Sequence, residues 1–159
     1  TENVAGIAGF GKACELAQKH LVSQESSSLS SLREHFYKLI SNQISGVEIF
    51  GDLENRLPNT LNLGFDEVEG DTLLIGLDMA GVAVSTGSAC SSGSGLPSPV
   101  LTAMGIPLDK INSSIRFSFG WGNTLAEVEE AAKVLEETVL LNRVGFSKEM
   151  NNKKLMKSL

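Results

Sequence analysis

Cysteine is scarce in this sequence of 159 residues, which contains only Cys14 and Cys90. The two cysteines are far apart and no C-x-x-C pair occurs, so the sequence offers neither the ligand spacing of a zinc site nor a redox dithiol. Neither His20 nor His35 has a metal-ligating partner three or four positions along the chain. We therefore predict no metal site.

Long apolar runs and excess positive charge are also missing. No segment approaches the roughly 18 apolar residues that a membrane-spanning helix needs. The net charge is −6, which argues against general binding of nucleic acids, because that function requires a basic surface. No signal-peptide pattern is found, so we expect a cytoplasmic protein with reduced cysteines, with an organelle as the open alternative.

What is present is an ordinary globular composition, with 42% hydrophobic and 20% charged residues. A chain of this length is expected to form one domain with an extra element at one end. Hydrophobic periodicity predicts several helices and four short strands, which indicates an α+β fold with a small sheet covered by helices. The predicted helices cover 3–22, 69–79, 98–105 and 124–141, with another built on Leu29 to Ile40, and the predicted strands cover 46–51, 59–65, 81–85 and 113–120.

Local capping signals support two of these helices. Ser98 followed by Pro99 is typical of a helix start, because the serine can cap it and proline suits the first helical position. Thr124 and Glu127 together form a capping box at the start of the last predicted helix. The serine-rich stretch 23–31 is interpreted as a hinge or a helix junction.

The stretch "STGSACSSGSG" at 85–95 carries one of the two cysteines. No side chain from Thr86 to Gly95 is larger than that of threonine or cysteine, so we expect an exposed, mobile loop. There Cys90 could react as a thiolate nucleophile. A chance cysteine in a glycine–serine linker is the open alternative. Cys14 lies in an apolar helix pattern and is predicted to be a small buried hydrophobe.

Arg116 is a second candidate for chemistry. It alternates with Ile115 and Phe117 on a predicted strand, so its side chain should leave the sheet on the face opposite the core. The planar guanidinium suits bidentate binding of a carboxylate or a phosphate. From the strand pattern by itself, a solvated arginine is the simpler interpretation.

Three stretches, "VSTGSACSSGS", "VLTAMGIP" and "SSIRFSFGWGNTLAEVE", resemble in this order and spacing the C-terminal part of the NifS/IscS-like cysteine desulfurases, which are related to the class V aminotransferases. Upstream, "LPNTLNLGF" and "EGDTLLIGLDMAGVAVSTGSAC" fit the same family. The resemblance extends from about Thr1 to Arg143. The glycine–serine loop, which lacks an R-x-G-H-x-C motif, resembles the long-loop subgroup.

The resemblance implies a homodimeric enzyme of aminotransferase fold type I that depends on pyridoxal 5'-phosphate and converts L-cysteine to L-alanine. In this family the sulfur remains on the enzyme as a cysteine persulfide and passes to an iron–sulfur scaffold or another sulfur-acceptor protein. Carried over by motif, Cys90 would be the catalytic nucleophile and Arg116 would hold the substrate α-carboxylate. Thr1 would match a threonine that reaches the cofactor phosphate of the neighbouring subunit.

The resemblance also implies that part of the machinery lies outside this chain. The family's cofactor-binding lysine belongs to a large domain that precedes the region matching Thr1. We therefore expect 1–24 to be a helix from the end of that domain, 25–143 to be the small C-terminal domain with the catalytic loop, and 144–159 to be a basic tail. The isolated chain would then be inactive. The alternative is a non-catalytic sulfur-acceptor or scaffold-docking module of the same fold.

Overall fold

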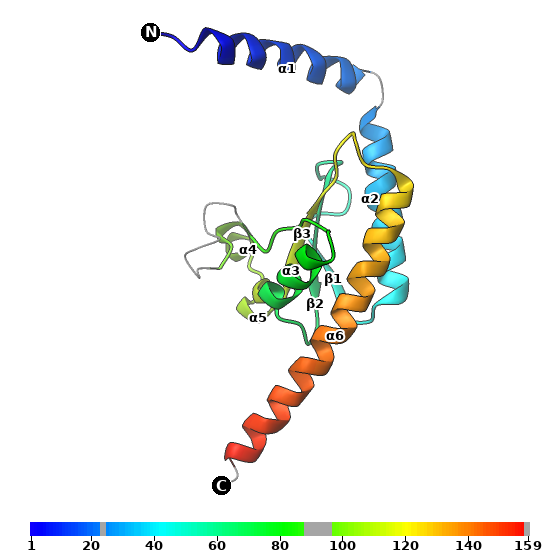
Figure 1. The fold of residues 1–159 in the computed structure, drawn as a ribbon, viewed down its shortest axis with the longest axis vertical. Helices are drawn as coiled ribbons and strands as arrows, with labels where there is room; N and C mark the ends of the chain where they lie inside the picture. The colour runs from blue at the N-terminus through cyan, green and yellow to red at the C-terminus, as the bar shows by residue number, and fades with distance from the viewer. Residues whose placement is uncertain (23–24, 88–96, 158–159) are drawn as a thin grey trace.

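A computed structural model describes residues 1–22, 25–87 and 97–157. Within these residues the chain forms six helices and one three-stranded sheet, which confirms the predicted α+β fold with a small antiparallel sheet covered by helices. In chain order the elements are α1 (Val4–Val22), α2 (Glu25–Gln43), β1 (Val47–Phe50), β2 (Thr60–Phe65), α3 (Gly70–Met79), α4 (Pro99–Ala103), α5 (Leu108–Asn112), β3 (Ser114–Ser118) and α6 (Leu125–Lys157) (Figure 1).

The sheet is antiparallel, with β2 in the middle between β1 and β3. Leu63 of β2 lies opposite Ile49 on one side and Ile115 on the other. Because successive side chains of a strand point to opposite faces, Leu61 and Phe117 share a face with this row. On β2 and β3, Leu61, Leu63, Ile115 and Phe117 are each 5% exposed or less. This face of the sheet is therefore one wall of the core.

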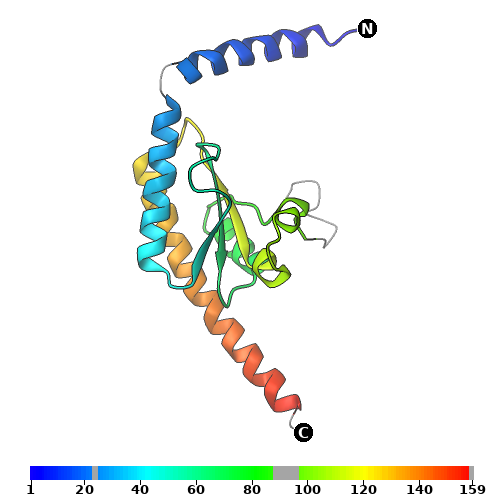
Figure 2. The same ribbon diagram turned by 180° about the vertical axis from the view of Figure 1, so that it is seen from behind.

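The main core lies between that face and helices α2, α3 and α6. Figures 1 and 2 show α2 and α6 running side by side along the sheet. The ring of Phe36 in α2 lies 4.9 Å from that of Phe117 and 5.7 Å from that of Phe119, measured between centroids. Leu135 and Val139 of α6 are fully buried in the same cluster. Burial stabilises by about 25 cal/mol per Å² of apolar surface, so this layer dominates the stability of the fold.

The opposite face of the sheet carries a smaller apolar cluster beneath α4 and α5. Phe50 of β1 packs there with Leu101 and Ile111. A Cβ atom added to Gly64 would lie 2.6 Å from the Phe50 ring, so the absence of a side chain on β2 allows this ring to lie flat on the sheet. This cluster covers the β1 side of the face. We call the whole of this face, which lies opposite the main core, the second face.

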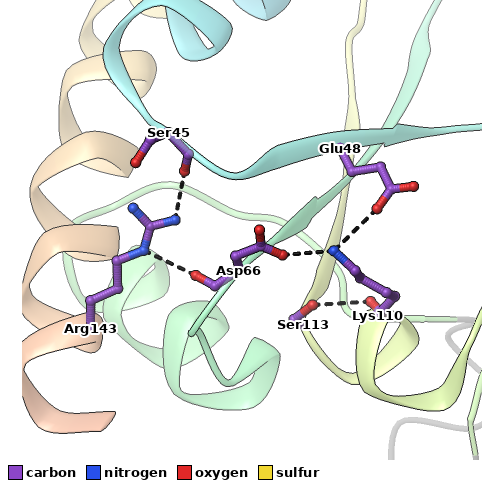
Figure 3. Close-up of polar contacts among 6 residues, drawn as sticks. All are labelled: Ser45, Glu48, Asp66, Lys110, Ser113 and Arg143. Atoms are coloured by element: carbon purple, nitrogen blue, oxygen red, sulfur yellow. Dashed lines mark hydrogen bonds and ion pairs between the residues drawn. The ribbon is translucent and has the colours of Figure 1, made fainter. Parts of the chain in front are cut away.

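Two cations tie the helices to the ends of the strands (Figure 3). The Nζ atom of Lys110 in α5 lies 2.7 Å from Asp66 Oδ1 and 3.2 Å from Glu48 Oε2. Hydrogen bonds to Asp66 and then Glu48 raise the pKa of Lys110 above its ordinary value. Arg143 of α6 donates from Nε to the Asp66 carbonyl at 3.0 Å and from its terminal nitrogen to the Ser45 carbonyl at 2.7 Å. The end of β2 is thereby held between α5 and α6.

Helix α1 extends away from the sheet (Figures 1 and 2). Its apolar side chains are exposed, with Ile7 at 63% and Phe10 at 73%. Cys14 is an exposed free thiol, so the prediction of a buried cysteine is wrong. The apolar pattern was read correctly as a helix, but within the described residues no surface covers it. One contact to the body is the ring of His20, which stacks on Trp121 at 3.9 Å.

The predicted capping signals are confirmed. The Ser98 hydroxyl accepts a hydrogen bond from the Leu101 N–H at 3.4 Å, and Pro99 opens α4. Thr124 N–H donates to the Glu127 carboxylate at 2.8 Å, and Glu127 N–H donates to the Thr124 hydroxyl at 3.3 Å. These reciprocal bonds satisfy donors at the start of α6, and the bonds that the Glu127 carboxylate accepts from Thr124 lower the pKa of Glu127.

The predicted strand at 81–85 is wrong. Only Ser85 pairs, in an isolated antiparallel bridge with Arg116. The Val82 N–H instead donates to the Leu77 carbonyl at 2.8 Å, so the backbone after α3 closes the end of that helix rather than a sheet ladder. The alternation of valines that suggested a strand reflects packing of this segment against the core.

Two helices differ from prediction in extent. Helix α5 was not predicted, although Pro107 at its start and Asp109 in its first turn are ordinary signals of a short helix. Helix α6 continues to Lys157, so the predicted boundary between 25–143 and 144–159 falls within one helix. At the other end of the body, α2 begins at Glu25 inside the serine-rich stretch, and 23–24 lie outside the described residues.

Candidate functional site

Arg116 lies in the middle of β3 on the second face, as its alternation with buried neighbours predicted. Ile115 is fully buried and Phe117 is 5% exposed, whereas Arg116 is half-buried. The backbone N–H and carbonyl groups of Arg116 point away from β2, toward the edge of the sheet. There the N–H donates to the Ser85 carbonyl at 2.7 Å, and the carbonyl accepts from the Ser85 N–H at 3.2 Å. The segment that follows α3 is therefore fixed beside Arg116.

Asn62 of β2 is the cross-strand neighbour of Arg116 on the other side. Because the N–H and carbonyl groups of Arg116 bond to Ser85, its pairing with Asn62 is of the non-hydrogen-bonded kind. In such pairs the Cα atoms are about 4.5 Å apart and the side chains lie closer than in the hydrogen-bonded kind. The carboxamide of Asn62 and the guanidinium of Arg116 thus start from adjacent points of the second face.

The Arg116 side chain makes no hydrogen bond or ion pair with another described residue. Two other arginines have structural partners. Arg33 is 8% exposed and donates to the Leu57 carbonyl at 2.8 Å, and Arg143 donates to two backbone carbonyls. Arg116 therefore differs from them in retaining donors for an anionic ligand, and a carboxylate matches its fork.

The other predicted site residues are not placed beside Arg116. Cys90 lies outside the described residues. Ser85 is five positions before Cys90, and five residues of extended chain span at most about 18 Å, so the covalent chain sets an upper limit on the distance between their Cα atoms. Thr1 is exposed at the end of α1 that points away from the sheet (Figure 1).

Two hollows in the described surface lie elsewhere. One of about 460 Å³ is bounded by 80–84, the end of β3 and α6, and one of about 410 Å³ lies between α3 and α6. Arg116 lines neither of them. The candidate site is therefore described by Arg116, a half-buried side chain on the second face, and by its strand neighbours.

Asn62 is the site residue that sequence reasoning missed. The strand "NTLNLGF" was predicted with Leu61 and Leu63 on the core face, which placed Asn62 on the other face. The alternation predicted which face of the sheet carries Asn62, but not which residue of the next strand lies opposite it. Only the strand register sets Asn62 opposite Arg116.

Residues 1–131 match the class-V aminotransferase family. The chain belongs to this family. The match covers well over half of the sequence, including α1, the sheet and Arg116.

Among curated relatives, the chain is similar to "Cysteine desulfurase IscS" of Dictyoglomus turgidum, with 45% identity over 139 residues, or 87% of this chain and 35% of the relative. It is 46% identical over 140 residues to "Putative cysteine desulfurase IscS 1" of Bacillus subtilis, which is 87% of this chain and 37% of that protein. The class-V chain thus spans little more than a third of the length of these relatives and is homologous to their C-terminal region.

Solved structures agree with this assignment. A protein titled "NIFS-LIKE PROTEIN" superposes with a TM-score of 0.76 at 33% identity, covering 89% of this chain and 35% of the other. A NifS-like protein from Rickettsia africae superposes with a TM-score of 0.74 at 32% identity, covering 87% and 35%. The predicted family is therefore confirmed.

The family depends on pyridoxal phosphate, and the described residues of this class-V chain do not by themselves fit that cofactor. Lys110 is paired with Glu48 and Asp66 at the surface. Lys12 and Lys19 both pair with Glu15 on the exposed helix α1. These lysines have surface ion-pair roles, and Lys38 and Lys133 are exposed on α2 and α6, whereas a cofactor lysine must face an enclosed site.

The described residues also lack a metal cluster and a membrane-spanning helix. They contain no group of three or more His, Cys, Asp or Glu side chains that could hold a metal ion. Over the same part of the chain, no helix is both long and apolar enough to cross a bilayer.

Proposed function

We propose that this chain provides the sulfur-accepting cysteine and the substrate-binding arginine of a cysteine desulfurase. The observation that carries the proposal is the bridge between Ser85 and Arg116. It holds a guanidinium with no described partner beside the start of the segment that leads to Cys90. The similarity to proteins named as cysteine desulfurases supplies the substrate class.

In the proposed reaction the Cys90 thiolate is the nucleophile and attacks the sulfur atom of the substrate L-cysteine. A sulfur–sulfur bond forms and the carbon–sulfur bond of the substrate breaks. The carbon leaves with the electron pair and takes up a proton, which gives L-alanine, while Cys90 retains the sulfur as a persulfide. Atoms and electrons balance, because the substrate carbon is reduced as the transferred sulfur is oxidised. Arg116 orients the substrate by its α-carboxylate through two parallel hydrogen bonds.

The chain is proposed to work with a large domain that holds pyridoxal 5'-phosphate, whose ring would supply an electron sink for cleavage of the carbon–sulfur bond. In this division, 1–24 belongs to the large domain, 25–143 is the small domain and 144–159 is a basic tail. The exposed apolar side chains of α1 support the first boundary, because such a helix is stable when a further surface covers it. Thr1 is proposed to reach the cofactor phosphate of the neighbouring subunit in a homodimer.

The proposed partners follow from the same family. L-Cysteine is the substrate, and an iron–sulfur scaffold or another sulfur-acceptor protein receives the persulfide sulfur. We place the reaction in the cytoplasm. No membrane or nucleic acid takes part in it.

The experiment that tests this function compares wild type and Cys90→Ala in the cofactor-loaded protein where this chain is joined to its large domain. We expect L-cysteine to give L-alanine and a Cys90 peptide heavier by one sulfur atom in the wild type, and neither product in the variant. Equal L-alanine formation by both proteins would reject the assignment of Cys90.

A second candidate function is a non-catalytic sulfur-acceptor or scaffold-docking module of the same fold. The surface pairing of Lys12, Lys19 and Lys110 favours it, because these lysines form no described cofactor site. The gene distinguishes the two functions. An upstream lysine-bearing domain in the same reading frame supports the enzyme, and a gene that encodes this chain alone supports the module.

A further inference from the structure

We propose that Asn62 is a positioning residue for Arg116. Its side-chain carbonyl accepts a hydrogen bond from the guanidinium and fixes the direction in which the two forward N–H groups meet a substrate carboxylate. The inference rests on the carboxylate role proposed above for Arg116 and extends that role to the central strand of the sheet.

The two side chains are direct neighbours. Asn62 and Arg116 are register partners on β2 and β3, and both side chains leave the sheet on the second face. Their pairing is non-hydrogen-bonded, since Arg116 exchanges both backbone hydrogen bonds with Ser85. Cβ atoms in such pairs lie about 4.5–5.5 Å apart, which an amide and a guanidinium readily bridge.

Each of the two groups lacks what the other offers. The Oδ1 atom of Asn62 is buried and has no hydrogen-bond partner among the described residues. A buried polar atom without a partner is unusual in a folded protein and costs stability. The Arg116 guanidinium has donors and no described acceptor. A half-turn about the soft terminal torsion of Asn62 exchanges the positions of its oxygen and nitrogen and can direct the carbonyl to the arginine.

The hydroxyl of Ser118 lies only diagonally from Asn62 on the second face, and three other neighbours do not offer a donor. Phe50, its partner on β1, presents a ring that is 6% exposed and extends over Gly64. The hydroxyl of Thr60 donates to Asn59, and that of Ser114 donates to the Ile111 carbonyl. Arg116 is the neighbour with donors to spare.

The hydrogen bond has a specific consequence for binding. An arginine side chain that is already oriented loses less rotamer freedom when a carboxylate arrives. The same carboxylate is present in the substrate and in L-alanine, so the gain applies to binding rather than to bond cleavage. Asn62 should therefore affect KM and leave kcat nearly unchanged.

The test uses the cofactor-loaded protein in which this chain is joined to its large domain. Asn62→Ala should raise KM for L-cysteine about five- to tenfold, within the range of one ordinary intramolecular hydrogen bond, with kcat within about twofold. In the Cys90→Ala protein, which performs no sulfur transfer, Asn62→Ala should raise the dissociation constant of L-alanine by the same factor. Asn62→Ser, which keeps an acceptor oxygen, should recover part of the affinity.

Thr60→Ala is the matched control. Thr60 lies on the same strand and the same face as Asn62 but opposite Ser118. Removing its hydroxyl should therefore leave KM for L-cysteine unchanged. The unfolding temperature separates a structural role from a positioning role. Asn62→Ala removes one hydrogen bond to a half-buried guanidinium, which water can replace, so it should leave the unfolding temperature nearly unchanged.

The double variant decides whether Asn62 acts through Arg116. In an Arg116→Ala background, Asn62→Ala should change KM no further, and an equal increase in both backgrounds would overturn the inference. If Arg116→Ala raises KM while Asn62→Ala does not, the Asn62 inference fails and the proposed function stands. If Arg116→Ala leaves KM unchanged, both fail together.

Discussion

The two faces of the small sheet are built for different tasks. One face is covered by α2, α3 and α6, and its residues on β2 and β3 are almost entirely inaccessible to solvent. The second face has a small apolar cluster at β1 and, beside it, Asn62 and Arg116. Packing is complete where the sheet provides stability and incomplete where we propose that it binds substrate. The difference agrees with the substrate-binding role that we propose for the second face.

The largest expected effect tests whether the second face is incomplete. The 159-residue chain alone, supplied with pyridoxal phosphate and L-cysteine, should release no L-alanine, because its described lysines are either exposed or paired at the surface and form no described cofactor site. L-Alanine is measured by chromatography, with the chain joined to its large domain as the positive control. Release by the purified chain alone would show that it carries a complete site.

A substitution on the covered face should affect stability instead. Leu63 is fully buried at the centre of β2, and Leu63→Ala should lower the free energy of unfolding by about 2–5 kcal/mol, from lost burial and the cavity left behind. Urea denaturation followed by circular dichroism measures this. Leu53→Ala, at a side chain that is 65% exposed, is the control and should change stability by less than about 0.5 kcal/mol. Similar losses in both variants would contradict the assignment of the core.

Arg116 should give the opposite result, with a change in binding and little change in stability. In the complete enzyme, Arg116→Ala should raise KM for L-cysteine about tenfold or more, because a bidentate charged pair is lost. Arg116→Lys should recover only part of this, since an ammonium group lacks the planar fork. Steady-state kinetics measure both variants, and the unfolding temperature serves as the control. A KM that neither variant alters would remove Arg116 from the binding site.

The smallest expected effect concerns the ion pairs of Lys110 at the edge of the sheet. Its hydrogen bonds to Asp66 and Glu48 raise its pKa above the ordinary value of 10.5 in the folded state. A raised pKa in the folded state stabilises the protein fully at pH values below 10.5, and this contribution disappears as the pH rises through the folded-state pKa.

Urea midpoints of wild type and Lys110→Gln, measured as a function of pH, test this prediction. The wild type should be slightly the more stable well below pH 10.5, and the two curves should converge above it. The effect is small because the pair is solvent-exposed. Curves that remain parallel across this range would indicate that the pairing contributes nothing.

Most of the elements could be predicted from sequence because their signals are local. The capping box of Thr124 and Glu127 and the alternation around Arg116 depend on neighbours within a few residues. The segment 81–85 was mistaken for a strand because burial and strand pairing give the same alternation of valines. The α1 pattern predicted a helix correctly, yet Cys14 is exposed because a pattern does not reveal whether its covering surface belongs to the same chain.

The sequence by itself determined the family, the α+β fold and the face on which Arg116 lies, since motif, periodicity and alternation are properties of the chain. It also singled out Cys90 by the absence of bulky side chains around it. Tertiary structure alone decided which groups surround Arg116. Ser85 and Asn62 are distant from Arg116 in sequence, and only the register of backbone hydrogen bonds sets them on its two sides. Register results from packing of the whole core, so no local pattern could specify it.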